Sequence, residues 1–138
     1  MTIKLTIHCD EPWLSLIAKG VKPVEGRKGK QKYRDLKPGD KICFYCDRSE
    51  KSFVATVQKV DCFASLNDYL HSVSIEKALP GIASFEEGLH IYYQWSSVEE
   101  IAELGFVGIW IEPDLEDKQP CVAHQGLECA SSGDNCKK

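Results

Sequence analysis

The sequence predicts an α+β fold, a small mixed β-barrel with short helices at its periphery. Three observations support this prediction: strand patterns begin and end the apolar part of the chain, two more strand patterns lie in its first half, and helical patterns group in its second half. Few helices connect one strand to the next, which disfavours a doubly wound sheet. At 138 residues and 43% hydrophobic, the chain fits one domain with its own core.

The first strand and the first helix follow from the opening residues. Residues 2–9, TIKLTIHC, alternate apolar and polar side chains, which is typical of a half-buried strand. Residues 10–20 then offer Asp10 as an N-cap and space Trp13, Leu16 and Ile17 at helical intervals. We expect this helix to end at Gly20.

The next strands are separated by a turn. Residues 22–27, KPVEGR, form a brief extended piece whose proline favours the edge of a sheet. Residues 36–40, LKPGD, predict a turn, because the Pro-Gly pair favours turns and interrupts helices and strands. Two β-rich runs, residues 40–46 and 52–63, then predict a hairpin with a longer loop.

The second half of the domain carries helix-capping signals. Ser65 begins one helical segment, and the pairs Ser84 with Glu87 and Ser97 with Glu100 fit the capping box of two more. Residues 105–113, GFVGIWIEP, form an apolar, β-branched and aromatic run that predicts a strand buried on both faces.

The compact domain is expected to cover residues 1–113. Residues 114–138 lose apolar periodicity and gain polar residues, which predicts a polar, flexible C-terminal tail. Seven cysteines, an odd number, argue against a disulfide framework and favour reduced thiols inside the cell. No apolar run is long enough for a membrane span, and no signal peptide pattern opens the chain. We therefore expect an intracellular protein, cytoplasmic or nuclear, without a membrane partner.

Positive charge is concentrated in residues 20–40. This segment holds seven lysines and arginines and three acidic residues. The rest of the chain holds ten lysines and arginines and 18 acidic residues, so the whole chain has a net charge of −4. Its second part, RKGKQKYR, predicts a flexible loop that could face phosphates. The residues concerned are Lys28, Lys30, Lys32 and Arg34.

The first part of the segment contains a mixed-charge cluster. In an extended chain Glu25 and Arg27 project from one face, and a bend near Pro23 would bring Lys22 to them. An arginine fork holds a phosphate, a carboxylate or a base edge, a lysine adds a point charge, and a carboxylate accepts from an amine or serves as a general base. The cluster is therefore a candidate nucleobase or nucleotide site, the alternative being ordinary ion pairs on the barrel rim.

Three segments in this order resemble the ASCH domain family, a compact β-barrel related to the PUA domain. EPWLSLIAKGVKPVEGR is similar to the family's tryptophan-containing helix and Gly-x-Lys-x-x-Glu-x-Arg motif, here Gly20, Lys22, Glu25 and Arg27. LKPGDKICFY and residues 78–113 resemble the family's Gly-Asp turn and the Leu-Pro-Gly, Glu-Glu-Gly and paired-tyrosine pattern of small stand-alone members. The resemblance implies binding of RNA or a modified nucleoside in a cleft lined by Lys22, Glu25 and Arg27.

A catalytic alternative comes from the same resemblance. Small relatives that hydrolyse N4-acetylcytidine combine a lysine, a nucleophilic threonine, an arginine and a distant glutamate. Lys22 and Arg27 match the first and third positions, but Glu25 stands where the threonine would be. A hydrolase would then use Glu25 to activate water and Lys22 to stabilise the oxyanion. Glu86 and Glu87 are candidates for the distant acid, although capping explains Glu87.

Aromatic residues and metal ligands give weaker signals. Trp13 and Tyr92 are candidates to line the cleft, while Tyr93 and Trp95 could also stack on a base. Cys43 and Cys46 are three apart in a strand pattern and point to opposite faces, so we expect no metal site. A zinc site that combines these two cysteines with Cys121 and His124 is disfavoured too, and no cofactor is implied.

Three functions remain open from the sequence. The favoured one is binding of RNA or a nucleoside; an amidohydrolase acting on acylated cytidine, or an RNA-cleaving enzyme, is the catalytic alternative. The third is a protein-interaction module of a transcription or translation assembly, in which the basic loop meets an acidic protein partner.

Overall fold

The fold is a curled five-stranded sheet with helices at its periphery, as predicted. The computed structural model describes residues 2–114. The strands are β1 (Ile3–His8), β2 (Val24–Lys28), β3 (Lys41–Cys46), β4 (Lys51–Phe63) and β5 (Phe106–Pro113). The helices are α1 (Trp13–Ala18), α2 (Gln31–Arg34), α3 (Leu66–Val73), α4 (Ile75–Ala78), α5 (Phe85–Trp95) and α6 (Val98–Leu104). The class is therefore the small mixed α+β half-barrel expected of a PUA-like domain.

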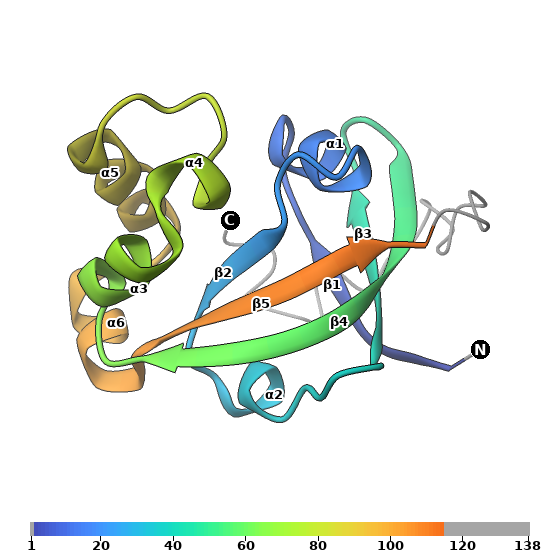
Figure 1. Cartoon of the computed structure of the whole chain (residues 1–138), viewed down its shortest axis with the longest axis horizontal. Coiled ribbons are helices and arrows are strands. Elements are labelled where there is room, and N and C mark those ends of the chain that lie inside the picture. The colour runs from blue at the N-terminus through green and yellow to red at the C-terminus, as the bar shows by residue number, and fades with distance from the viewer. Residues whose placement is uncertain (1, 115–138) are drawn as a thin grey trace.

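The positions of β2 and β5 in the sheet agree with their sequences. The strands run in the order β1-β3-β4-β5-β2, and every neighbouring pair is antiparallel except β1 and β3, which are parallel. Strand β2 lies at an edge, as Pro23 predicted, and β5 lies between β4 and β2 with four buried residues in succession, Phe106 to Ile109. Helices α3 to α6 gather at one end of the sheet, and α1 lies near the other (Figure 1).

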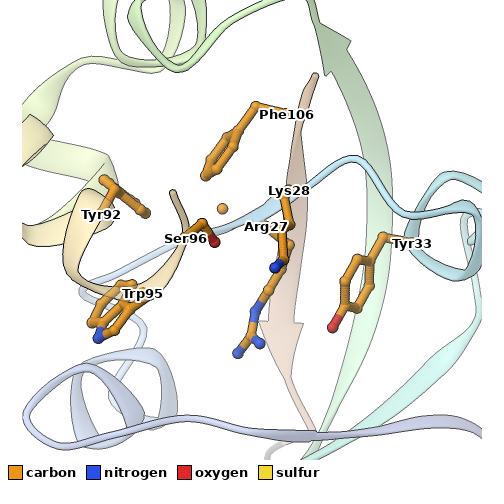
Figure 2. A pocket seen from close by; sticks show the side chains of 8 residues that line it. Arg27, Lys28, Tyr33, Tyr92, Trp95, Ser96 and Phe106 are labelled. Atoms are coloured by element: carbon orange, nitrogen blue, oxygen red, sulfur yellow. The ribbon is translucent and has the colours of Figure 1, made fainter. Parts of the chain in front are cut away.

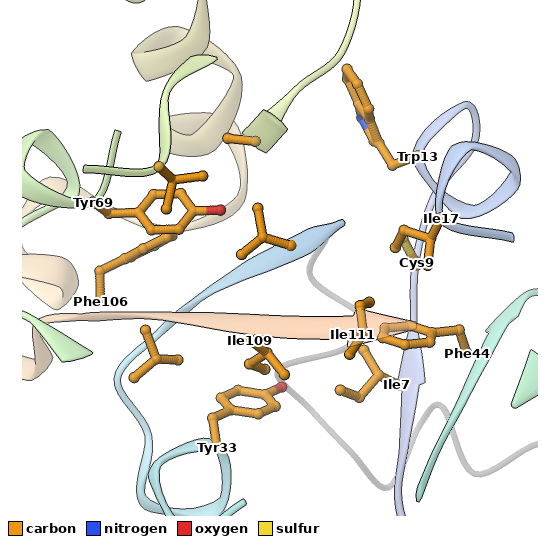
Figure 3. Close-up of a cluster of buried hydrophobic side chains, with 14 of the residues drawn as sticks. Ile7, Cys9, Trp13, Ile17, Tyr33, Phe44, Tyr69, Phe106, Ile109 and Ile111 are labelled. Carbon is orange, nitrogen blue, oxygen red and sulfur yellow. The ribbon is translucent and has the colours of Figure 1, made fainter. Parts of the chain in front are cut away.

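Apolar side chains from the sheet and helices form one core. Ile7, Ile17, Phe44 and Ile109 are each at most 1% exposed, and Figure 3 shows this group gathered beside β5. Burial of such side chains is the main source of stability for a domain of this size.

Two local predictions were wrong. Asp10 does not cap α1; the N-cap is Pro12, and the Glu11 carboxylate accepts a hydrogen bond from the Ser15 amide instead (3.1 Å). The basic segment is also not simply a loop, because Gln31–Arg34 form α2. This short helix is fixed by Tyr33, which is 1% exposed.

The three capping serines of the second half are confirmed. Ser65, Ser84 and Ser97 each accept a hydrogen bond from the amide three residues later, and Ser97 and Glu100 form the complete capping box. Helix α4 carries no such signal and was not predicted. The predicted tail falls outside the described residues from residue 115 onward.

In the part of the chain that is described, no helix is long and apolar enough to cross a membrane.

Candidate functional site

Lys22, Glu25 and Arg27 come together inside the domain. Their exposed fractions are 2%, 4% and 7%, and they are the charged residues that are buried among residues 2–114. Burying charge is costly unless the charges are paired and hydrogen-bonded. This cluster, called the buried charge cluster below, is therefore held together by specific contacts.

The local chain path explains how the three side chains meet. Glu25 and Arg27 lie two residues apart in β2, so they project from the same face of the strand. Lys22 precedes the strand and reaches them because the chain bends after α1: Gly20 has a φ of 81°, and the amides of Val21 and Lys22 both donate to the Leu16 carbonyl. This turn at Gly20 lies ahead of the bend that the sequence predicted near Pro23.

Glu25 and Arg27 form a close ion pair. One carboxylate oxygen, Glu25 Oε2, lies 2.9 Å from both Nε and Nη2 of Arg27. Arg27 Nη2 also donates to the backbone carbonyl of His8 in β1 (2.6 Å). Burial opposes the charged form of Arg27, but the neighbouring Glu25 carboxylate outweighs it and raises the arginine pKa above its usual value. Arg27 is therefore a fixed cation whose guanidinium plane is oriented by two different strands.

Lys22 is held by two backbone carbonyls and one carboxylate. Its ammonium group donates to the Val24 carbonyl (2.9 Å) and to the Ala78 carbonyl at the end of α4, and it lies 3.7 Å from Glu25 Oε1. Burial lowers the Lys22 pKa, and the Glu25 carboxylate offsets part of that shift. Two of the three donors of the ammonium are therefore hydrogen-bonded to carbonyl oxygens, and the Glu25 carboxylate adds an ion pair. Lys22 thus ties β2 to α4 from inside the protein.

A small pocket opens beside Arg27. Its volume is about 30 Å³, and Figure 2 shows the aromatic rings of its wall around the arginine. The lining residues are Gly26, Arg27, Lys28, Tyr33, Tyr92, Trp95, Ser96 and Phe106. Such a volume holds about one or two water molecules. A larger ligand can therefore place only an edge or a single group inside the pocket in this conformation.

The predicted cleft residues divide between the pocket and the layer behind it. Arg27 and Tyr92 line the pocket, whereas Lys22, Glu25 and Trp13 are not among its lining residues. Trp13 is 9% exposed, and its ring centre lies 5.9 Å from Lys22 Nζ, so the indole packs against the buried charge cluster.

Tyr33 and Phe106 line the pocket and were missed by sequence reasoning. Tyr33 sits in the unpredicted helix α2, and its ring centre is 5.9 Å from Arg27 Cζ. Phe106 opens β5 and packs against both Tyr69 and Tyr92. The sequence offered Tyr33 only as part of a basic run, and Phe106 only as part of an apolar strand.

The residues predicted to face phosphates have different roles. Lys28 is partly buried and pairs with exposed Glu100 (3.1 Å). Arg34 donates to the carbonyls of Gly29 (2.8 Å) and Leu104 (2.6 Å), which makes it a structural link between α2 and the end of α6. Lys32 lies 5.2 Å from the ring centre of its neighbour Tyr33, and Lys30 is the N-cap of α2. Lys28 alone of the four lines the pocket.

Glu86 and Glu87 lie in the first turn of α5 and are exposed. The Glu87 amide donates to Ser84 Oγ (3.1 Å), which confirms Ser84 as the N-cap of α5. Neither acid lines the pocket beside Arg27.

Two buried tyrosines under the pocket predict a loss of stability at alkaline pH. The hydroxyls of Tyr69 and Tyr92 lie 3.4 Å apart, and burial raises the pKa of both phenols above the ordinary value of 10.0. Because the unfolded chain ionises first, both residues stabilise the fold below pH 10 and lose that contribution as the pH rises through their folded pKa values. Urea unfolding above pH 10 should show a steeper loss of stability in the wild type than in Tyr69→Phe/Tyr92→Phe.

The lowered pKa of Lys22 makes stability rise with pH, because the unfolded chain binds more protons at this residue. This contribution is the same in the wild type and in the double variant, so it cancels in the comparison. Equal pH dependence of the wild type and the double variant would contradict the burial of these two phenols.

Comparisons with known proteins agree with the fold. A family model described as the ASCH domain matches residues 7–113. Hypothetical protein PH0355, known from a crystal structure, shares 34% sequence identity with this chain, and the two structures match with a TM-score of 0.72. The match covers 80% of this chain and 98% of that one. The solution structure of protein PF0455 from Pyrococcus furiosus is 33% identical, with a TM-score of 0.65, covering 79% of this chain and 96% of that one. No curated protein matches the chain.

Proposed function

Because the chain belongs to the ASCH domain family, we propose that it binds RNA or a nucleoside at the pocket beside Arg27. One observation carries the proposal: a buried, oriented arginine lies among four aromatic rings, with a lysine at the edge of the same pocket. Arginine, aromatic rings and a nearby cation are the groups with which proteins hold single-stranded nucleic acid.

Arg27 supplies the polar contact. Its bonds to Glu25 and the His8 carbonyl use Nε and Nη2, so we assign Nη1 to the ligand. A guanidinium presents donors in a rigid plane that suits a base carbonyl or a phosphate oxygen. Since Arg27 is already held by its neighbours, little side-chain entropy is lost on binding.

Trp95 supplies the stacking surface. It is only partly buried, whereas Tyr33, Tyr92 and Phe106 are between 1% and 3% exposed. The small volume of the pocket admits the polar edge of a base, while the base ring remains at the mouth on the indole. Lys28, also partly exposed, then reaches the neighbouring phosphate and exchanges its weak surface pair with Glu100 for that contact.

The buried charge cluster favours binding over amide hydrolysis. Lys22 donates to two backbone carbonyls and pairs with Glu25, and Glu25 is held by two cations. Neither residue lines the pocket. An oxyanion donor or a general base must reach the reacting atoms, and both residues lie behind the pocket wall instead.

The binding test is a titration of short single-stranded RNA, followed by fluorescence anisotropy at several salt concentrations. Trp95→Ala should weaken binding by about 5- to 150-fold, because stacking contributes about 1–3 kcal/mol per base. Lys28→Ala should reduce the slope of log affinity against log salt by about 0.7, the value for one phosphate of a single strand. Adding Lys30→Ala and Lys32→Ala should lower the slope further.

Lys59→Ala is the matched control, since Lys59 is an exposed lysine of β4 that does not line the pocket. Wild-type affinity in the Trp95 variant, or an equal loss in the Lys59 variant, would contradict the assignment of the pocket. A protein that binds no RNA or nucleoside but retains a protein partner through purification would support the interaction-module alternative.

A further inference from the structure

We propose that His8, Asp10 and Cys46 form a binding site for a transition-metal ion of the zinc class. One potential ligand atom from each residue, a ring nitrogen of His8, an Asp10 carboxylate oxygen and Cys46 Sγ, lies within 4.8 Å of the other two. The proposal does not depend on RNA binding, because none of the three residues lines the pocket beside Arg27.

The parallel pairing of β1 and β3 brings these residues together. His8 pairs with Tyr45 at the ends of the two strands, and the Cys9 amide donates to the Tyr45 carbonyl (2.8 Å). Cys46 is the last residue of β3, and Asp10 follows β1 by two residues. Parallel neighbours end at the same edge of a sheet, so residues far apart in sequence converge there.

The distances are close to those of a coordinated ion. Bonds of about 2.0–2.3 Å to nitrogen, oxygen and sulfur in a tetrahedron place neighbouring ligand atoms roughly 3.3–3.7 Å apart. His8 Nδ1 and Asp10 Oδ1 are already 3.7 Å apart. Side-chain rotation of Asp10, which is 37% exposed, can shorten the distances from its carboxylate to the other two ligand atoms without moving the strands.

The chemistry of the three groups favours zinc over magnesium or calcium. Thiolate and imidazole are ligands of zinc and related transition metals, whereas magnesium and calcium require oxygen ligands. The Cys46 thiol would release its proton to solvent when the metal–sulfur bond forms, which leaves two anionic ligands against the two positive charges of the ion.

The arrangement leaves one coordination position open. Asp10 and Cys46 border a cavity of about 320 Å³ together with Glu11, Arg48 and Ser49. Three protein ligands beside such a cavity match the open type of zinc site, in which water or another small ligand fills the fourth position. The site would therefore be accessible to solvent and not a closed structural centre.

The test uses Co²⁺ and Zn²⁺ with the reduced full-length chain. Co²⁺ should produce a thiolate charge-transfer absorption that Zn²⁺ displaces. Cys46→Ala should abolish this absorption, and Asp10→Asn, at a partly exposed position, should weaken Zn²⁺ binding by about tenfold or more with the fold intact by circular dichroism. Cys62→Ser is the matched control, because Cys62 is an exposed free cysteine outside the cluster.

The cysteines beyond residue 114 must be separated from Cys46 in this test. A full-length variant with Cys121→Ser, Cys129→Ser and Cys136→Ser should keep the absorption. Its loss in that variant, its persistence in Cys46→Ala, or its absence from the wild type would each overturn the proposal. Unchanged Zn²⁺ affinity in Asp10→Asn would do so as well, even if Cys46→Ala failed to fold.

Discussion

Replacing Glu25 with alanine is expected to lower the free energy of unfolding by about 3–5 kcal/mol. Glu25 is 4% exposed, and its carboxylate lies 2.9 Å from two nitrogens of Arg27 and 3.7 Å from Lys22 Nζ. Without it, two cations remain buried with no opposing charge between them. Urea unfolding at neutral pH measures the change directly.

Glu112→Ala provides the control for this prediction. Glu112 is an exposed acid of β5 that accepts a hydrogen bond from Gln58 (2.7 Å), and its removal should change stability by no more than about 0.5 kcal/mol. If the two variants lost similar amounts of stability, the buried charge cluster would not be desolvated in solution. Replacing all three charged residues with apolar ones should recover much of the loss, because no unpaired charge is then left in the core.

Replacing Arg27 with lysine is expected to weaken binding of single-stranded RNA by about 10- to 150-fold. A lysine keeps the positive charge beside Glu25 but cannot bond Glu25, the His8 carbonyl and a ligand from one rigid plane. Losing hydrogen bonds to a charged group costs about 1.5–3 kcal/mol. Each 1.4 kcal/mol of binding free energy corresponds to a tenfold change in affinity. Fluorescence anisotropy of the folded variant measures the effect.

The variant Arg34→Lys is the control that distinguishes loss of a ligand contact from a general effect on the fold. Arg34 is also fixed by backbone carbonyls, those of Gly29 and Leu104, but it does not line the pocket. This variant should lose stability and keep its affinity for RNA. Equal affinity losses in the Arg27 and Arg34 variants would indicate that the change acts through the fold and not through a contact with the ligand.

The strands and the charged cluster were predictable because their signals are local. Apolar alternation identified β1, the capping serines identified α3, α5 and α6, and the spacing of Glu25 and Arg27 placed them on one face of a strand. The small mixed fold with helices at its periphery also followed from the succession of strands and helices.

The depth of the cluster was not predictable in the same way. Three charged residues in a basic segment suggest an exposed site, whereas Lys22 is buried because the Ala78 carbonyl, 56 residues away, accepts from it. The pocket wall depends on equally distant contacts, since Tyr33, Trp95 and Phe106 come from three separate elements. The pair His8 and Cys46 likewise meets only through the parallel register of β1 and β3.

The most direct test of the account is chemical-shift mapping of the ¹⁵N-labelled protein during titration with a short single-stranded RNA. The account predicts that the largest changes fall on the amides of Gly26 to Lys28 and of Tyr92 to Ser96, with the Arg27 side-chain Nε signal among them. Changes confined to the amides of Lys19, Gln58 and Glu112 would place the ligand in a different hollow, which these residues line, and would contradict the pocket beside Arg27.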